Sequence, residues 1–410
     1  MTENLRIPQH ARTVLISGAS IAGPSLAYWL SRYGYAVTVV EKAPKLREGG
    51  FAVDFRGDAH RTVLERMGMW EEIHRRQTHM GVQSFVDEAG AEQVSVPAEF
   101  MSGDVEIFRG ELSKILYERT RNSVEYIFGD SITSLEETAD EVRVTFERTA
   151  PRSYDLVVGA DGLHSHVRRL AFGDESLFLR HLGHYVAGYD VPNDLGLDRT
   201  ARWLNAPGRG VSVNNYDGDP ARAGVSMVFA SPELTYDRRD IAAQKRILAE
   251  QYAGLGWEVP RLLKGLEETE ELYFDAIAQV RMDRWSKGRV VLLGDAGYGA
   301  TMGGMGTGLA VVCAYVLAGE LATQRDHRAA FAGYEAEIRE FVMGCQKTAE
   351  GAGGFLAPPT EKKIRTRNFT YRMLTSKVMS GILAKLTVKA ANNIKLKDYP
   401  AQLASVRAAA

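Results

Sequence analysis

A glycine-rich turn near the N-terminus constrains the fold more than any other feature of the sequence. The segment Gly18-Ala-Ser-Ile-Ala-Gly23 follows a β-rich run at 13–17 and leads into a predicted helix at 24–33, and a second predicted strand ends at Glu41. Gly18 permits a tight turn, and Gly23 lets the helix pack closely on the strand. The helix N-terminus then faces a pyrophosphate, while the Glu41 carboxylate accepts hydrogen bonds from ribose hydroxyls. The opening therefore predicts a dinucleotide-binding α/β domain.

The details of this motif narrow the choice of dinucleotide. An acidic residue at the ribose repels a 2′-phosphate, which favours FAD or NAD over NADP. Ser20 replaces the middle glycine of the motif and is small enough for close approach of a ligand to the backbone. The cofactor-binding residues expected from this part of the chain are Gly18, Ser20, Ile21, Gly23, Glu41 and Lys42.

Two further motifs place an aspartate directly after a predicted buried strand. Asp161 follows the apolar run at 154–159, and Asp295 follows the run at 289–293. Ligands of open α/β sheets bind at this carboxyl edge, although either aspartate could equally be a helix cap. After Asp295 come a glycine-rich loop and an apolar helix, whose N-terminus suits an electron-rich ring oxygen. These motifs add Asp161, Gly294, Asp295, Gly304, Met305 and Gly306 as cofactor-binding candidates.

The pattern changes between residues 183 and 230, where short alternating segments are separated by Asn, Asp, Gly and Pro. Such a pattern is typical of an antiparallel sheet with one buried face. The predicted fold class is α/β: a three-layer Rossmann-like nucleotide-binding domain, an inserted and mostly antiparallel sheet domain for the substrate, and C-terminal helices. The expected boundaries are 1–78, 104–180 and 282–350 for the first domain, 79–103 and 181–281 for the second, and 351–410 for the helical segment.

Taken in this order over residues 12–345, the three motifs resemble those of the class A FAD-dependent monooxygenases, the family of p-hydroxybenzoate hydroxylase and the tetracycline-inactivating monooxygenases. The resemblance implies that the first motif binds the FAD pyrophosphate and that Glu41 binds the adenosine ribose. It further implies that Asp161-Gly162 serves FAD and the nicotinamide donor, and that Gly294-Asp295 binds the ribityl chain. Two arginines also match the family: Arg47 on the phosphate side and Arg109 near the flavin.

The resemblance also implies a reaction. FAD is reduced by NADH or NADPH, for which no second dinucleotide domain is visible, and a flavin C4a-hydroperoxide then hydroxylates, or inserts oxygen into, an apolar aromatic or polycyclic small molecule. The flavin carries this chemistry, so Arg109 is the single candidate for a catalytic side chain.

The sequence departs from the family pattern after the third motif. Tyr298 stands where the commoner members have histidine, and the stretch 299–303 lacks their prolines. This departure bears on the oxygen chemistry rather than on FAD binding. Two alternatives follow: a flavoprotein whose structural FAD supports a non-redox cyclisation, and an NAD-dependent dehydrogenase, against which Gly294-Asp295 counts.

Candidate substrate residues lie on the inserted sheet. They are Trp203, Asn214, Tyr216, Met227 and Phe229. The competing explanation is that alternating apolar residues form only the core of their own domain.

Composition limits the partners and the compartment. A net charge of −2 over 410 residues gives no electrostatic reason to expect nucleic acid as a partner. Two cysteines, Cys313 and Cys345, indicate a reducing, cytoplasmic environment. The histidines show no metal-ligand spacing, and the longest apolar run, 309–318, is about half a membrane span, so we expect no stable membrane insertion. The basic segment 362–397 is interpreted as a helix packed across the two domains. The oligomeric state is left open.

Overall fold

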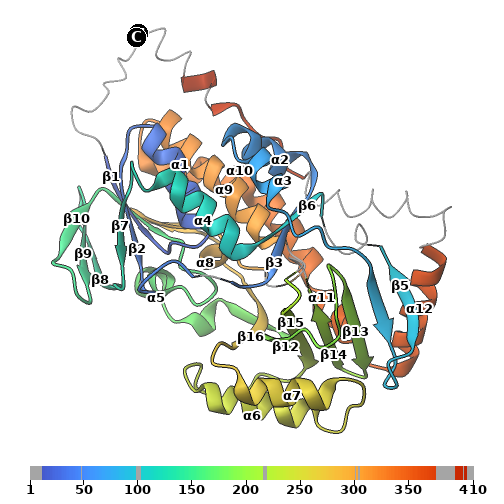
Figure 1. Cartoon of the computed structure of the whole chain (residues 1–410). Coiled ribbons are helices and arrows are strands. Elements are labelled where there is room, and N and C mark those ends of the chain that lie inside the picture. The colour runs from blue at the N-terminus through green and yellow to red at the C-terminus, as the bar shows by residue number, and fades with distance from the viewer. Residues whose placement is uncertain are drawn as a thin grey trace.

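The computed structural model has the predicted α/β architecture, with a nucleotide-binding part, a second part built on a large sheet, and C-terminal helices (Figure 1). It describes residues 12–47, 49–97, 103–215, 219–300, 302, 305–374, 393–399 and 401–403.

A six-stranded sheet forms the centre of the first part, in the order β17-β18-β11-β1-β2-β7. Strand β1 (Thr13–Ser17) lies between β2 (Ala36–Glu41) and β11 (Leu156–Gly159), and β18 (Val290–Leu292) lies beside β11, all in parallel. These strands read as continuous apolar runs because both faces of the sheet are covered. Their carboxyl ends lie side by side, so the three motifs that follow β1, β11 and β18 meet at one edge. The outer strands are β7 (Glu125–Phe128), parallel to β2, and β17 (Ser286–Lys287), antiparallel to β18.

Helices cover one face of this sheet and a small antiparallel sheet lies on the other (Figure 1). The helical layer contains α1 (Ala22–Arg32), α4 (Arg109–Thr120), α9 (Gly306–Thr323) and α10 (His327–Ala349), with α2 (Gly57–Arg66) and α3 (Trp70–Arg75) beside them. The small sheet contains β8 (Ile132–Glu137), β9 (Val142–Phe146) and β10 (Arg152–Tyr154), with α5 (His166–Phe172) packed against β8.

Helix α9 is long and apolar enough to cross a membrane, yet 78% of it is buried inside the protein. It packs between α1 and α10 as the central helix of the core. Its apolar surface is explained by contacts with neighbouring helices.

The second part is built on a seven-stranded sheet in the order β16-β12-β15-β14-β13-β4-β5. Its strands are β4 (Gln83–Val86), β5 (Glu92–Val96), β12 (Leu179–Pro192), β13 (Ala201–Ala206), β14 (Arg209–Asn214), β15 (Arg222–Ala230) and β16 (Tyr273–Val280). All neighbours are antiparallel except β4 and β13, which come from two distant segments and pair in parallel. The exact domain boundaries remain a prediction.

The two faces of this sheet have different partners. Helices α6 (Ile241–Tyr252) and α7 (Val259–Glu268) cover one face and complete an apolar core with it. The opposite face looks toward the nucleotide-binding part (Figure 1). At that boundary Phe51, which precedes β3 (Ala52–Phe55), occupies the space left by Gly188, where a Cβ atom would lie 2.5 Å from the ring.

The C-terminal segment contacts both parts of the protein. After α11 (Ala352–Leu356), helix α12 (Glu361–Leu374) packs across β5 and β13. Residues 393–399 then run along α9, where Glu320 accepts hydrogen bonds from Lys397 Nζ (2.9 Å) and Tyr399 Oη (2.7 Å). The middle of the predicted basic helix lies outside the described residues.

Candidate flavin-binding site

The first glycine turn has the geometry that a pyrophosphate loop requires. Gly18 has φ +107°, and a Cβ atom there would lie 2.4 Å from the carbonyl oxygen of Ala160. A Cβ at Gly23 would lie 2.0 Å from the carbonyl oxygen of Gly18. The turn after β1 therefore packs directly on the chain after β11, and only glycine fits at either position.

Glu41 lies at the carboxyl end of β2, as predicted, but its carboxylate already has partners. It accepts hydrogen bonds from the backbone N–H groups of Ala19 (2.8 Å) and Ala43 (2.9 Å). Glu41 thus fixes the first turn against the second strand, and its remaining lone pairs are available to ribose hydroxyls. Lys42 and Arg47, two other predicted contacts, have exposed side chains.

Asp161 acts in this structure as a cap of α5. Its carboxylate accepts hydrogen bonds from the backbone N–H groups of His166 (2.9 Å) and Val167 (3.1 Å) and from the Ser165 hydroxyl. Of the two roles that the sequence left open, the structure shows the cap. The adjoining Gly162 has φ +85° and lies in the turn after β11, which faces the turn after β1.

Asp295 is placed differently, at the start of α8 (Asp295–Tyr298). Its side chain is accessible, yet the surrounding protein raises the pKa of its carboxyl, an effect that the charge of Arg109 opposes. A group that is both deeply recessed and accessible lines a cleft. A Cβ at Gly306, the first residue of α9, would lie 3.5 Å from its Oδ1 atom. Within the described part of the chain this carboxylate accepts no hydrogen bond, so it is free to bind a hydroxyl.

Arg109 joins this cleft to the first motif. Its guanidinium donates to the Ser20 hydroxyl from Nη2 (2.9 Å) and Nε (3.2 Å). Tyr273 of β16, which the sequence did not suggest, is 41% exposed and lies close enough to Arg109 and Asp295 to feel both charges, while burial of its hydroxyl raises its pKa. It brings the edge of the seven-stranded sheet to the same cleft.

The loop between α8 and α9 carries unusual backbone geometry. Met302 (φ +59°) and Met305 (φ +54°) both adopt the left-handed conformation, which costs non-glycine residues energy and is often found at ligand sites. Met305 is the N-cap of α9. Gly294 packs between helices, with the position of a Cβ atom 3.1 Å from Ala22 of α1. Gly304 lies outside the described residues.

The predicted substrate residues separate onto the two faces of the large sheet. Met227 and Phe229 are fully buried in the core with α6 and α7. The prediction that they line a substrate pocket is wrong, because their face of β15 points away from the nucleotide-binding part. Trp203 and Asn214 do lie on the face that looks toward it, and Tyr216 lies outside the described residues.

The face of this sheet that looks toward the nucleotide-binding part also carries three small residues that the sequence did not suggest, Gly188, Ser212 and Ser226. Register places Gly188, Ser226, Ser212 and Trp203 in one row across four strands. Ser212 is fully buried and its hydroxyl has no hydrogen-bond partner among the described residues, and Asn214, two residues along, is 3% exposed. Ser212, like the predicted Asn214, differs from the apolar alternation of the neighbouring strands, and that difference is the signal that could have identified it.

A charged cluster connects the two parts behind the Asp161–Gly162 turn. His164 Nε2 lies 3.1 Å from the carboxylate of Asp275 on β16, and His164 Nδ1 lies 3.1 Å from Glu175 of the short helix η2 (Glu175–Leu177). Arg238 approaches the same Nδ1 (2.6 Å), and the fully buried Arg168 binds Glu175 (3.1 Å). Burial lowers the pKa of His164, but hydrogen bonds to the two carboxylates outweigh it and raise the pKa overall.

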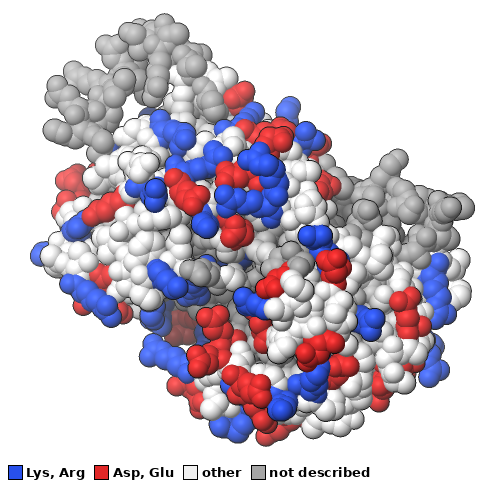
Figure 2. Space-filling model, in the orientation of Figure 1, with Lys and Arg blue, Asp and Glu red and all other residues white. Residues whose placement is uncertain are grey.

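The described residues contain no group of His, Cys, Asp and Glu that could hold a metal ion. Acidic and basic side chains interleave over the face drawn in Figure 2, without a large patch of one sign.

Comparisons with known proteins agree with this geometry. Residues 11–175 match the family model described as FAD binding domain. A flavin-dependent monooxygenase from an unknown prokaryotic organism is 38% identical over 398 residues, which cover 95% of this chain and 100% of that protein. The chain belongs to the class A flavin-dependent monooxygenases.

Two further similarities support the assignment. The crystal structure of tetracycline destructase Tet(55) superposes on 95% of this monooxygenase and 100% of its own chain, with a TM-score of 0.83 and 37% identity. An uncharacterised protein of Mycobacterium tuberculosis is 44% identical over 339 residues, 81% of this chain and 91% of that protein. The enzyme is therefore an FAD-dependent oxidoreductase, and the alternative of an NAD-dependent dehydrogenase is wrong.

The residues present fit FAD. The cradle at Gly18 and Gly23 has room for backbone only, and Asp295 offers a recessed carboxylate that accepts no hydrogen bond from the residues the structure describes. Gly18, Ser20 and Gly23 would hold the pyrophosphate, Glu41 the adenosine ribose and Asp295 the ribityl chain. The N-terminus of α9 would face the flavin ring.

Proposed function

We propose that this enzyme uses NADH or NADPH and O2 to oxygenate a flat, apolar, polycyclic or aromatic small molecule in the cytoplasm. One oxygen atom enters the substrate, the other leaves as water, and the nicotinamide gives up a hydride. When bound, FAD supplies the redox chemistry and the activation of oxygen. The protein must therefore bind and orient the substrate and keep water away from the reacting atoms.

The observation that carries the substrate proposal is the surface of the seven-stranded sheet that faces the nucleotide-binding part. Gly188, Ser226 and Ser212 are adjacent across three strands and form a row of small residues, the proposed floor of the substrate site. Phe51 stands over Gly188 at one end, and Trp203 follows Ser212 at the other. A planar ring system fits between two aromatic side chains over such a floor.

Polar groups on the same floor indicate what the edge of the substrate carries. A buried hydroxyl without a partner, such as that of Ser212, costs free energy unless a ligand satisfies it. Asn214 has its amide on the same face of β14, and Trp203 already donates its N–H to Gln83 (2.9 Å). The unsatisfied Ser212 hydroxyl and the neighbouring Asn214 amide therefore suit a substrate with hydroxyl or carbonyl oxygens along one edge.

Arg109 and Asp295 have separate tasks in this proposal. Arg109, bound to Ser20 and exposed to the cleft, keeps a positive charge near the electron-rich flavin. Asp295 holds the cofactor at the N-terminus of α9. Met302, which packs with Val186, Val228 and Ile277, closes the apolar side of the substrate site and helps to exclude water.

Tetracycline is the first substrate to test, since Tet(55) is a tetracycline destructase by name and tetracycline is a flat polycycle with an oxygen-rich edge. We expect the purified yellow protein to oxidise NADH or NADPH slowly alone and faster with tetracycline. Ser212→Val should raise KM for tetracycline by roughly 2- to 12-fold, the effect of one neutral hydrogen bond. The matched control is Ser134→Val on β8, outside the site. Equal KM values in both variants would exclude Ser212 from substrate recognition.

A further inference from the structure

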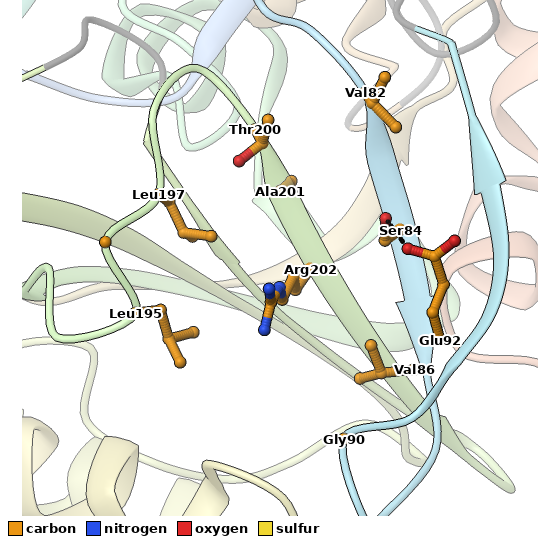
Figure 3. A pocket seen from close by; sticks show the side chains of 11 residues that line it. Val82, Ser84, Val86, Gly90, Glu92, Leu195, Leu197, Thr200, Ala201 and Arg202 are labelled. Carbon is orange, nitrogen blue, oxygen red and sulfur yellow. Dashed lines mark hydrogen bonds between the residues drawn. The ribbon is translucent and has the colours of Figure 1, made fainter.

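A second cavity lies away from the flavin cleft, on the side of the large sheet that α6 and α7 partly cover. Its volume is about 300 Å³, at the lower end of the range for small-molecule sites. Figure 3 shows that β4, β13 and the loop before β13 enclose it. None of the flavin-binding candidates lines this cavity.

One cationic side chain, that of Arg202, projects into the cavity. In Figure 3 the guanidinium of Arg202 points into the space between the loop at Leu195–Leu197 and strand β4. Arg202 makes no hydrogen bond or ion pair with any described residue. The carboxylate of Glu92, at the opposite wall, accepts a hydrogen bond from Ser84 (2.8 Å) and is directed toward that hydroxyl. Hydrogen bonds from Ser95 and Ser84, together with the charge of Arg202, lower the pKa of the Glu92 carboxyl, so the two charges interact across the cavity. The five N–H donors of Arg202 nevertheless have no hydrogen-bond partner among the described residues, and they suit a carboxylate.

The remaining walls are mixed, with hydroxyls from Ser84 and Thr200 beside apolar side chains. Val82 is 46% exposed, an unusual degree for a large aliphatic side chain, and Leu195 is half-buried, while Val86 and Leu197 are already buried behind them. A ligand that covers these side chains removes apolar surface from water.

The loop that forms one wall is held in place before any ligand binds. The Asn193 side chain donates to the carbonyl oxygen of Leu197 (2.8 Å) and accepts from its N–H (2.9 Å). The carbonyl oxygen of Arg199 accepts from the N–H of Gly81 (2.6 Å), which ties the loop to the start of β4. A preformed wall reduces the ordering cost of binding.

We propose that this cavity is a second ligand site, which binds a small monoanionic carboxylate with an apolar body. The carboxylate pairs with Arg202, and the body lies against Val82 and Leu195. A site with one cationic side chain suits a ligand with a single negative charge rather than a phosphate. The site spans the parallel pair of β4 and β13, so an occupant links two chain segments that are distant in sequence.

The cavity and the substrate floor lie back to back on the same strands. Arg202 points into the cavity, while its neighbour Trp203 points to the flavin-facing side. Trp203 stacks with Phe85 of β4 at 6.2 Å between ring centroids, and so reports on the same strand pair. Occupancy of the cavity is therefore expected to change the fluorescence of Trp203.

The test uses the FAD-loaded enzyme with three probes: 4-phenylbutyrate, its uncharged amide and inorganic phosphate. We expect calorimetry to show saturable binding of the acid, at least about tenfold weaker binding of the amide, and none of phosphate. Arg202→Gln should weaken binding of the acid at least about tenfold without changing FAD content. Arg143→Gln, an exposed strand arginine on β9, is the matched control.

Three results would overturn the proposal. These are equal binding of acid and amide, equal losses in the Arg202→Gln and Arg143→Gln variants, and unchanged binding of the acid in Arg202→Gln. Phosphate that competes with the acid would show that the apolar walls contribute nothing. The fluorescence change on adding the acid should also disappear in Trp203→Phe, and its persistence there would place the ligand elsewhere. All these measurements are independent of the oxygenation reaction.

Discussion

Replacing Asp295 with alanine should weaken FAD binding without destabilising the protein. The carboxylate accepts no hydrogen bond from the described residues, and burial raises its pKa, so in the absence of cofactor it contributes nothing favourable to folding. With FAD bound it would accept a hydrogen bond from the ribityl chain. Loss of such a charged hydrogen bond costs about 1–3 kcal/mol, which corresponds to a roughly 5- to 150-fold increase in Kd.

The assay measures two quantities on the same Asp295→Ala protein. FAD affinity comes from fluorescence titration of the apoprotein, and stability comes from the thermal midpoint of the apoprotein without FAD. We expect the midpoint to stay within about 2 °C of wild type while Kd rises. A midpoint that falls sharply while Kd stays constant would show that Asp295 is a structural helix residue, and the assignment to the ribityl chain would be wrong.

Glu41→Ala is the informative contrast, because the structure gives Glu41 two backbone partners. Loss of the hydrogen bonds from Ala19 and Ala43 should lower apoprotein stability by about 1–3 kcal/mol and also weaken FAD binding. We therefore expect Asp295→Ala to weaken FAD binding alone, and Glu41→Ala to lower both FAD affinity and apoprotein stability. Identical behaviour of the two variants would contradict the geometry of one of them.

Two further predictions concern the backbone and pH. Gly18→Ala should abolish FAD retention, because the new Cβ would lie 2.4 Å from the carbonyl oxygen of Ala160; a yellow Gly18→Ala protein would contradict this. His164 has a pKa raised above its ordinary 6.5 by Asp275 and Glu175, although burial and the nearby Arg238 oppose its charge. Its contribution to stability is therefore complete below pH 6.5 and is lost as pH rises through the folded-state pKa, so thermal midpoints of wild type and His164→Gln should converge at high pH. Constant separation of the two midpoints from pH 5 to 9 would exclude this linkage.

The nucleotide-binding part could be predicted from the sequence because its signals are local. A tight turn between β1 and α1 needs glycine at 18 and 23, and buried parallel strands need continuous apolar runs. Both requirements concern residues that are close together in the sequence, so a short segment is enough to recognise each of them. The convergence of the three motifs then followed from the parallel order of β1, β11 and β18.

The substrate face could not be predicted in the same way. Alternation along β15 shows that Met227 and Phe229 share one face, but not which face packs on helices. That choice is made by α6 and α7, which come later in the chain and cover the side opposite to the flavin. The residues on the face toward the nucleotide-binding part, Ser212 and Ser226, are small and polar and carry no apolar periodicity.

Tertiary contacts also decided the roles of single charged residues. The sequence leaves Asp161 open between ligand and cap; the structure shows the cap at the N-terminus of α5, and the contact of Asp161 with FAD stays a prediction. Arg168, in a segment read only as part of a motif, is fully buried and donates to the carbonyl oxygens of Ala296 (2.9 Å) and Leu163 (2.7 Å). Such long-range partners leave no pattern in the neighbouring sequence.

The origin of the oxygen atom in the product tests the proposed monooxygenase reaction most directly. The FAD-loaded enzyme is incubated with tetracycline and NADH or NADPH under ¹⁸O2, and the molecular mass of the product is measured by mass spectrometry. We expect a product that contains one ¹⁸O atom, and no product when either O2 or the nicotinamide is omitted. Conversion of tetracycline to an isomer without O2 and nicotinamide, with FAD still bound, would contradict it and favour a flavoprotein whose FAD is structural.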